Sequence, residues 1–526
     1  MITQILLPVT ATLVAYLLYH ALQILYNNLT SPLRNILSGP PNPNLLIGNF
    51  KEMAEDARLS SRWREEYGKN FIFHGLFSIS ELHTSDLKAL NHIMSHAEIY
   101  QRATANRDNS RRLMGEVSRK YEPQRRFLWT KQFSCAISGR PRLRSKMERE
   151  RGGVVEVFSG LRKMTLDVIG RAGFGYEFNA LEPGGQYNEL NQVFTDLFHS
   201  PKSNLYGLIR LAQGHIPILK LLPLPGIQVT HSARTRMDTI GRQIIKESKA
   251  RLLTDQQNQE DKIKALGGRR DLLSILLKSN MSPGLPESQR LSEAEIISQI
   301  PAFFVAGHET TSAATAWALH VLSMDKPVQD RLRDEVAAVG TDNPTFEEVN
   351  GLPFLEKVLR ETLRLYAPVM FMQRKAMADD VLPLAKPVVD SNGREHWNLP
   401  IRKGQMIHIP MWAVNTATDT WGEDALEFKP DRWDNIPEAA SAVPGVWGNL
   451  FTFFAGPHNC IGFRFSIAEL KIILFTLIRA FEVSPALPEG GIGPVTAGVM
   501  QRPAVLAEQH KGSGLPLVLR PIQTIL

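Results

Sequence analysis

Residues 453–462 read Phe453-Phe454-Ala455-Gly456-Pro457-His458-Asn459-Cys460-Ile461-Gly462. A cysteine here lies in a loop that contains glycine and proline, and the pattern predicts an apolar helix directly after it, over Phe463 to Phe481. Backbone N–H groups at a helix N-terminus carry partial positive charge, which stabilises a thiolate and lowers the pKa of a thiol. The glycines also let the backbone approach a flat cofactor closely. The stretch therefore predicts a ligating or reactive cysteine.

Three roles for Cys460 remain open on the residues alone: a heme ligand, a nucleophile, and an inert buried thiol. A nucleophile needs a histidine base, and His458 is too near in the chain to point reliably at the sulfur. A thiolate ligand pushes electron density onto heme iron and favours O–O cleavage. Cys135 is the only other cysteine, so a disulfide framework is not expected, and Cys135 is expected to pack as a small hydrophobe.

The pattern Phe-x-x-Gly-x-x-x-Cys-x-Gly resembles the signature of the cytochrome P-450 family, the heme-thiolate monooxygenases, and the chain looks most similar to fungal membrane-bound members. The resemblance implies that Cys460 is the axial ligand of heme b. It also implies that Phe453 shields the sulfur and that Gly456, His458 and Gly462 belong to the cofactor-binding loop.

The residues that would bind the heme propionates depart in part from the family pattern. His458 stands where members usually carry an arginine, and the charge of histidine depends on pH. Phe454 stands where a small residue is common. Arg374 matches a propionate-binding arginine of the family. The family's Trp-x-x-x-Arg spacing is absent near residues 120–135, and three basic residues there remain candidates for the second propionate: Arg125, Arg126 and Lys131.

A second motif is Glu361-Thr362-Leu363-Arg364, where acid and base share one face of a predicted helix. Such pairs are common on solvated surfaces, where they contribute only about 0 to 1 kcal/mol. The motif resembles the family's Glu-x-x-Arg, and Arg432 matches its downstream partner. The resemblance implies a structural triad of Glu361, Arg364 and Arg432 below the heme.

The third motif, Ala306-Gly307-His308-Glu309-Thr310-Thr311, lies inside a long helix predicted from the capping box at Ser292 to about Met324. Glycine and a buried acid are unfavourable in such a helix, and a groove beside bound oxygen would explain them. The motif resembles the family's oxygen-activation motif. That resemblance assigns the catalytic roles to Thr310, which would hydrogen-bond the bound oxygen, and to Glu309, which would relay protons from solvent.

Segments that line the substrate pocket in the family are apolar here, and methionine adapts its shape to a ligand. This favours a lipophilic small molecule, for which a terpenoid or another fungal secondary-metabolite intermediate is expected by analogy. Plain core packing is the alternative role for these residues. They are Phe303, Phe304, Val305, Ala306, Val369, Met370, Phe371, Met372, Val499 and Met500.

The N-terminal segment from Ile5 to Tyr26 lacks Asp, Glu, Lys and Arg, and it has the length of a membrane-spanning helix. A cleaved signal peptide would have a basic start, which is absent. Residues 39–43 then read Gly-Pro-Pro-Asn-Pro, a stiff spacer. We expect a membrane anchor over 1–30, a proline-rich hinge over 31–50 and a monooxygenase domain over 51–526. The expected location is the endoplasmic reticulum membrane, single-pass, with the catalytic domain facing the cytosol.

The fold class implied by the resemblance is mainly α, the cytochrome P-450 fold with a minor β-rich lobe, preceded by the N-terminal transmembrane helix. The implied reaction inserts one atom of O₂ into the substrate. No flavin or nicotinamide fingerprint is apparent, so the expected partner is a separate NADPH-dependent flavoprotein reductase. The net charge is +7, but the sequence carries no nucleic-acid-binding signature, so nucleic acid is not an expected partner. The alternatives are an O₂-independent heme-thiolate isomerase or dehydratase, and a non-catalytic heme-binding protein.

Overall fold

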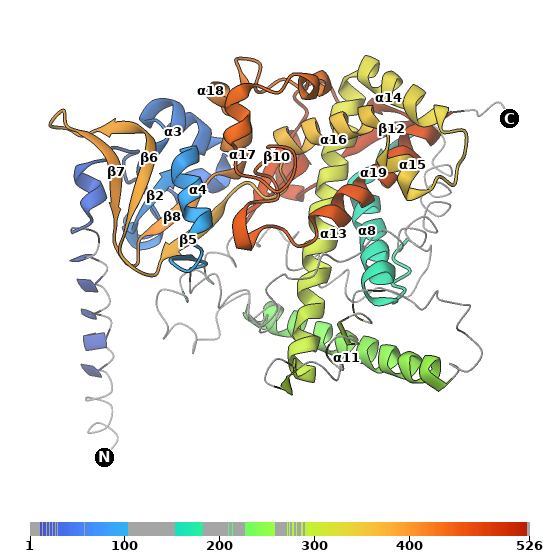
Figure 1. The fold of residues 1–526 in the computed structure, drawn as a ribbon, viewed down its shortest axis with the longest axis horizontal. Helices are drawn as coiled ribbons and strands as arrows, with labels where there is room; N and C mark the ends of the chain where they lie inside the picture. Colours follow the sequence, from blue (N-terminus) through green and yellow to red (C-terminus); the bar gives the residue numbers. More distant parts are fainter. Residues whose placement is uncertain are drawn as a thin grey trace.

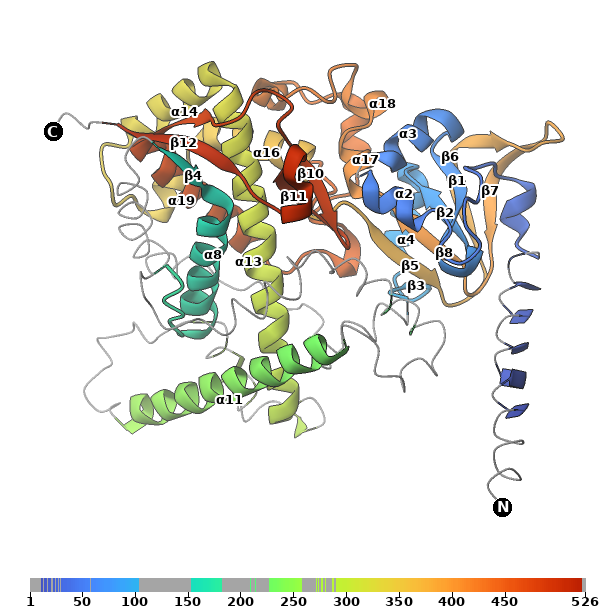
Figure 2. The same cartoon turned by 180° about the vertical axis from the view of Figure 1, so that it is seen from behind.

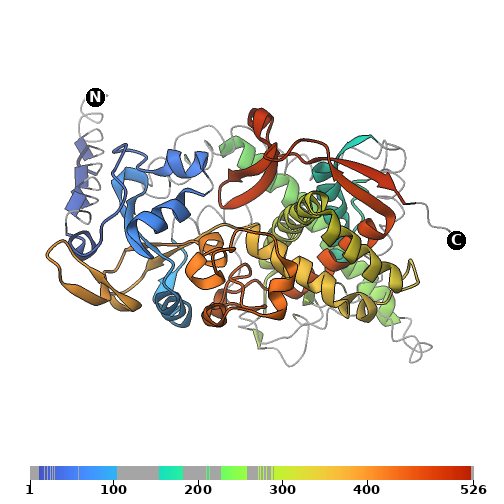
Figure 3. The same cartoon turned by 90° about the horizontal axis from the view of Figure 1, so that it is seen from above.

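The structure, a computed structural model, describes residues 30–56, 58–103, 153–181, 227–257 and 290–522, with single positions between 11 and 28, at 209 and 213, and between 271 and 287. A helical body lies beside a smaller β-rich lobe, and the N-terminal helix extends from that lobe (Figure 1). The view from above shows the same two-part arrangement (Figure 3). The predicted mainly helical fold with a minor β lobe is confirmed.

The helical body is organised around α13, Glu293–Met324, which runs through its centre (Figure 1). Its predicted capping box is present, because the Ser292 hydroxyl accepts from the Glu295 N–H and the Glu295 carboxylate accepts from the Ser292 N–H. The helix runs through Pro301 without interruption. The other helices of four or more residues described here are α2 Phe50–Glu55, α3 Leu59–Tyr67, α4 Leu87–Ser95, α8 Val157–Phe174, α11 Ile227–Gln257, α14 Lys326–Ala338, α15 Phe346–Asn350, α16 Pro353–Leu365, α17 Met411–Asn415, α18 Thr418–Trp421 and α19 Phe463–Ala480.

Helix α13 contacts α8, α11, α14, α16 and α19. Helix α8 lies alongside α13, and α11 crosses its N-terminal end (Figures 1 and 2). The helix predicted over Phe463 to Phe481 is confirmed as α19. The amphipathic runs near Val328–Val339 and Phe354–Tyr366 form α14 and α16, each to within about two residues at its ends. The short 3₁₀ helices are η1 Pro32–Asn35, η2 Leu76–Ser78, η6 Pro430–Asp434, η7 Glu438–Ala442, η8 Gly456–His458 and η9 Leu506–Lys511.

The β-rich lobe contains a five-stranded sheet with the order β1-β2-β8-β5-β3. Strand β2 pairs in parallel with β8, and the other neighbours are antiparallel. A separate hairpin, β6–β7, has a register shift between Pro383 and Val388. The strands are β1 Asn70–His74, β2 Ser80–Thr84, β3 Tyr100–Gln101, β5 Met372–Ala376, β6 Asp380–Val389, β7 Glu395–Ile401 and β8 Met406–Ile409.

Two smaller sheets lie against the helical body (Figure 2). One is the antiparallel hairpin of β10, Ile492–Ala497, and β11, Met500–Val505. The other has the order β4-β12-β9. Its strands are β4 Val154–Glu156, β12 Pro516–Pro521 and β9 Phe481–Pro485. The runs of β-type residues near Met406–Pro410 and Leu517–Arg520 form β8 and β12.

The segment at the end of the N-terminal helix packs against the β lobe through hydrogen bonds and buried leucines. The buried Asn28 side chain donates to the Ser78 carbonyl and accepts from the Ser80 N–H, at 2.8 and 3.0 Å. Leu33 and Leu37 are buried in the core of the lobe. Among the residues that the structure describes, no helix is long and apolar enough to span a bilayer. The predicted transmembrane helix over Ile5 to Tyr26 therefore stays a prediction, and several of its positions, residues 5–10 among them, lie outside the described residues.

Candidate functional site

The cysteine loop folds back on itself before α19 begins. The Cys460 N–H donates to the Phe453 carbonyl at 2.9 Å, and Gly462 is the N-cap of α19. Cys460 is exposed, and Phe453 is buried in the main core. Gly456 has φ +65°, and a Cβ there would lie 2.6 Å from the Met94 carbonyl oxygen of α4. Only glycine fits this position, because both its dihedral angle and its close approach to α4 exclude a side chain.

The environment of the sulfur differs from the expectation. Desolvation raises the pKa of the Cys460 thiol, and the Gly462 N–H lowers it by hydrogen-bonding the sulfur. The expected fall in pKa at a helix N-terminus is therefore wrong for the protein alone, because desolvation is the larger effect. A bound metal ion deprotonates a coordinating thiol outright. An iron bound at Cys460 would thus supply the charge that the helix end does not.

The oxygen-activation motif presents a short open stripe on α13. Ala306 is exposed and Thr310 is half-buried one turn later, and the Thr310 hydroxyl donates to the Ala306 carbonyl at 2.7 Å. Gly307 has a packing role, and the expected groove beside oxygen stays a prediction. A Cβ there would lie 2.9 Å from the Ile169 side chain, so glycine permits the close packing of α8 on α13.

Glu309 is held in a buried cluster of basic side chains, and its side chain is 1% exposed. Its carboxylate lies 3.4 Å from Arg162 of α8, 3.1 Å from His308 and 3.2 Å from Arg502 of β11. Buried acids need such partners. Sequence reasoning missed Arg162 and Arg502, because they come from distant segments that carry no motif. A proton relay through Glu309 stays a prediction, and it would have to pass through this cluster.

The residues of the predicted triad lie together and are buried. Arg364 binds Glu361 through two hydrogen bonds of 2.8 and 2.9 Å, and the Arg432 Nε lies 3.3 Å from the same carboxylate. Arg364 also donates to the carbonyls of Asn415 and Ala425. The triad therefore joins α16 to the segments that precede the cysteine loop.

Arg374 provides a test of whether the site fits a heme. It is 1% exposed on β5; its Nη1 donates to the Gln373 carbonyl, and its Nη2 has no hydrogen-bond partner among the described residues. Burial, together with the positive charge of Arg102, lowers the pKa of Arg374 to about 9. A buried cation without a counter-ion is costly, and a heme propionate would supply the missing charge. The residues present therefore fit the cofactor.

The second propionate contact remains a prediction. Arg125, Arg126 and Lys131 lie outside the described residues, as does Cys135. Arg102, next to the short strand β3, lies close enough to Arg374 to lower its pKa, and no local motif marked it. We therefore add Arg102 to the candidates. His458 is exposed at the end of η8, in the loop that also carries Cys460.

The predicted pocket segments come together from three parts of the chain. Val369 and Met500 form an isolated β-bridge, and the Met370 N–H donates to the Val499 carbonyl at 2.9 Å. Strand β11 also contacts α13. Phe304 is a core residue, with its ring 4.5 and 5.1 Å from Phe174 and Phe178. Val499 and Ala306 are exposed, Met370 is buried, and partly buried positions are held by Phe303, Val305, Val369, Phe371, Met372 and Met500.

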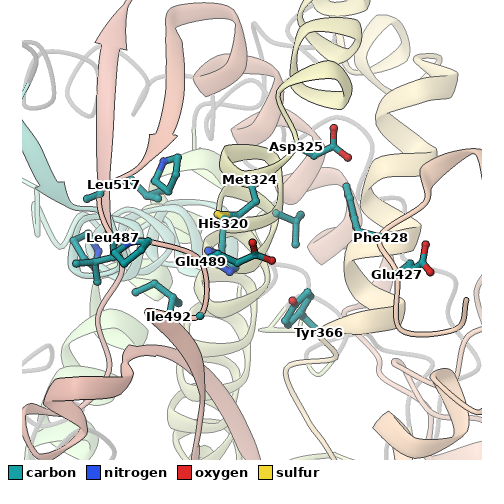
Figure 4. A pocket seen from close by; sticks show the side chains of 16 residues that line it. His320, Met324, Asp325, Tyr366, Glu427, Phe428, Leu487, Glu489, Ile492 and Leu517 are labelled. Carbon is teal, nitrogen blue, oxygen red and sulfur yellow. The ribbon is translucent and has the colours of Figure 1, made fainter.

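A pocket of about 400 Å³ lies elsewhere, at the C-terminal end of α13 (Figure 4). His320, Met324, Tyr366, Phe428 and Leu487 are among the side chains around it (Figure 4). None of the predicted substrate-pocket residues lines it. The pocket is therefore separate from the predicted substrate-pocket residues.

Comparison with known proteins agrees with the geometry. The family model for cytochrome P-450 matches residues 141–503. The chain is 41% identical to cytochrome P-450 monooxygenase 128 of Postia placenta, over 97% of this chain and 96% of the relative. It is 39% identical to monooxygenase 205 of the same fungus, over 99% of each chain. Ganoderic acid synthetase of Ganoderma lucidum is 31% identical over 86% of this chain and 88% of its own length. With these matches and a site that fits heme b, the chain belongs to the cytochrome P-450 family of monooxygenases.

Proposed function

We propose that this protein uses O₂ and electrons from a separate reductase to hydroxylate or otherwise oxidise a lipophilic small molecule, with Cys460 as the thiolate that would hold heme b. The observation that carries the proposal is the link between the two motif-bearing helices. The Thr311 hydroxyl of α13 lies 3.3 Å from the Ser466 hydroxyl of α19. Thr311 follows Thr310 directly, and Ser466 is in the first turns of the helix that follows Cys460. This contact supports the proposal that the oxygen-activation motif and the thiolate loop serve one site.

Heme held by Cys460 would supply the activation of O₂ and the oxidation of the substrate. The protein's own residues position protons. Because the Thr310 hydroxyl donates its proton to Ala306, its lone pairs are left to accept a hydrogen bond on the open side of α13. A water or a protonated oxygen can therefore be held at Thr310 Oγ1. Glu309 is the neighbouring carboxylate, and its contacts with Arg162 and Arg502 make those arginines part of any proton path.

At the propionate end, Arg374 would neutralise one carboxylate through its free Nη2. The Glu361, Arg364 and Arg432 triad would hold the chain beneath the cofactor and touch no substrate. Phe453 would shield the Cys460 sulfur, since its ring is buried beside the loop. His458 would contact a propionate with a pH-dependent charge.

Electrons would come from an NADPH-dependent flavoprotein reductase, because the chain carries no nicotinamide or flavin fingerprint of its own. Ile461, which is 65% exposed, and the exposed Arg464 flank the thiolate loop and α19 on the outside. A positively charged side chain there suits an acidic flavoprotein.

The proposed substrate is a terpenoid or another fungal secondary-metabolite intermediate. The apolar segments around Val369 and Met500 support a lipophilic molecule, because they offer few hydrogen-bonding side chains. The relative named ganoderic acid synthetase supports the proposal that the substrate is a fungal secondary-metabolite intermediate.

We further propose that residues 1–30 anchor the protein in the endoplasmic reticulum membrane, that 31–50 connect the anchor to the body, and that 51–526 face the cytosol as the monooxygenase domain. The uncharged stretch of residues 5–26 and its exposed Leu18 and Leu22 support an apolar anchor. Deletion of residues 1–27 spares the Asn28 hydrogen bonds and should move the protein at least partly from the membrane pellet to the supernatant. An unchanged pellet fraction would contradict the anchor.

The test of the function is turnover of candidate substrates by the purified protein with reductase and NADPH. Thr310→Ala should still consume NADPH but release peroxide in place of product. Thr315→Ala is the matched control, because Thr315 makes the same type of hydrogen bond, to the Thr311 carbonyl at 2.8 Å, yet is fully buried. Turnover without NADPH would favour an isomerase or dehydratase. A protein that binds heme and converts no substrate would favour a non-catalytic role.

A further inference from the structure

Phe454 has a backbone conformation that a bulky residue rarely adopts. Its φ is +61°, in the left-handed region, and its side chain is 4% exposed. The Phe454 N–H donates to the Phe451 carbonyl at 2.8 Å, which closes a tight turn before the cysteine loop. Glycine would fit this turn with less strain, because it has no Cβ. Strain that persists at a functional site calls for a compensating contact.

The ring of Phe454 lies against a buried cation. The guanidinium carbon of Arg374 is 4.7 Å from the ring centroid, within the range of a cation–π contact. Arg374 is 1% exposed and makes one hydrogen bond through Nη1, so water does not stabilise its charge. Cation–π contacts are strongest where the cation is desolvated. The ring face therefore stabilises and orients a guanidinium whose one hydrogen bond, among the residues that the structure describes, is to the Gln373 carbonyl.

The same loop lacks an arginine. His458 stands where the family usually carries an arginine. Arg374, whose guanidinium contacts the Phe454 ring, therefore supplies a hydrogen-bond donor at that end of the site. Its free Nη2 is the atom that a propionate oxygen can accept from. An Arg374 held in a fixed rotamer loses less entropy when it binds the propionate.

We propose that Phe454 is a positioning residue for the heme: its ring holds the Arg374 guanidinium in the orientation that binds a propionate, in a loop that carries His458 in place of an arginine. The inference rests on the proposed roles of Arg374 and Cys460. It concerns how firmly the cofactor is held, so heme release can test it without any substrate.

The experiment measures the rate at which purified holoprotein transfers its heme to excess apomyoglobin. Phe454→Leu removes the ring face while it keeps an apolar side chain, and we expect release to become about 5- to 30-fold faster, equivalent to about 1 to 2 kcal/mol. Phe454→Tyr keeps the ring and should release heme at nearly the wild-type rate. Phe454→Met serves as the second ring-free variant if Phe454→Leu does not fold.

A double-mutant cycle with Arg374→Gln separates positioning from packing. If Phe454 acts through Arg374, Phe454→Leu should accelerate heme release little in the Arg374→Gln background. Phe451→Leu is the matched control. Phe451 is fully buried, and its ring centroid lies 5.1 Å from that of Phe454, but the cation–π contact of Arg374 is made with Phe454. Its effect on release should be the same in both backgrounds.

Two results would overturn the inference. One is equal acceleration by Phe454→Leu with and without Arg374, which would make Phe454 a packing residue. The other is unchanged release in both ring-free variants. Failure of the underlying function would look different, because wild-type holoprotein would then lack the thiolate-type spectrum of its reduced, CO-bound form. That outcome would remove the basis of the inference as well.

Discussion

Glu361→Gln removes one negative charge from the buried triad and leaves its two arginines in place. Glu361 and Arg364 are both fully buried, and the carboxylate accepts at 2.8 and 2.9 Å from Arg364 and at 3.0 Å from the Lys429 N–H. The change therefore strands a guanidinium charge away from water. Breaking a buried ion pair in this way costs about 3 to 5 kcal/mol.

The assay is thermal unfolding followed by circular dichroism. Unfolding entropy is about 2 cal/mol/K per residue, so for a chain of 526 residues this loss corresponds to a midpoint lowered by about 3 to 5 °C. The matched control is Asp431→Asn, which breaks the Arg331–Asp431 pair at 2.7 Å nearby. Both partners of that pair are more than half exposed, so its loss should cost under about 1 kcal/mol. Equal midpoints for the two variants would refute the buried-charge argument.

Two further predictions concern the glycine of the cysteine loop and a buried acid of the β lobe. Gly456→Ala should abolish stable heme binding, because a Cβ would lie 2.6 Å from the Met94 carbonyl oxygen. The measurement is the heme content of the purified protein. The control is Gly490→Ala, which is also at positive φ but has open space around it and should retain heme. Burial raises the pKa of Glu81 to about 7 from 4.5, with a partly offsetting hydrogen bond from Gln373. The unfolded chain therefore loses this proton first, so the Glu81 contribution to stability falls as pH rises from about 4.5 to 7. Glu81→Gln should therefore weaken the pH dependence of the thermal unfolding midpoint between about pH 4.5 and 7. An unchanged pH dependence would show that Glu81 does not titrate in that range.

The long helices could be predicted because their signals are local. The Ser292 capping box marks the start of α13, and the apolar run after Gly462 marks α19. Most strands of the β lobe were not predicted. Their pairing joins distant segments, as where His83 of β2 lies beside His408 of β8. Such pairing depends on tertiary contacts more than on local preference.

In the candidate site too, features with a local sequence signal could be predicted and features that depend on tertiary contacts could not. The motifs containing Cys460, Glu361 and Thr310 are contiguous and could be identified directly. The partners of Glu309, namely Arg162 and Arg502, come from α8 and β11 and carry no local pattern. The packing role of Gly307 could not be predicted either, because the side chain beside it, Ile169, comes from α8. Phe454 was recognised as unusual, but its contact with Arg374 is a tertiary feature.

The central claim is that Cys460 supplies a thiolate to heme iron, and the absorption spectrum of the reduced, CO-bound protein tests it most directly. The wild-type protein should show the strongly red-shifted Soret band of a thiolate-bound heme. Cys460→Ala should lose that band, and Phe451→Leu, in the same region of the chain, should keep it. A red-shifted band that persists in Cys460→Ala would contradict the account.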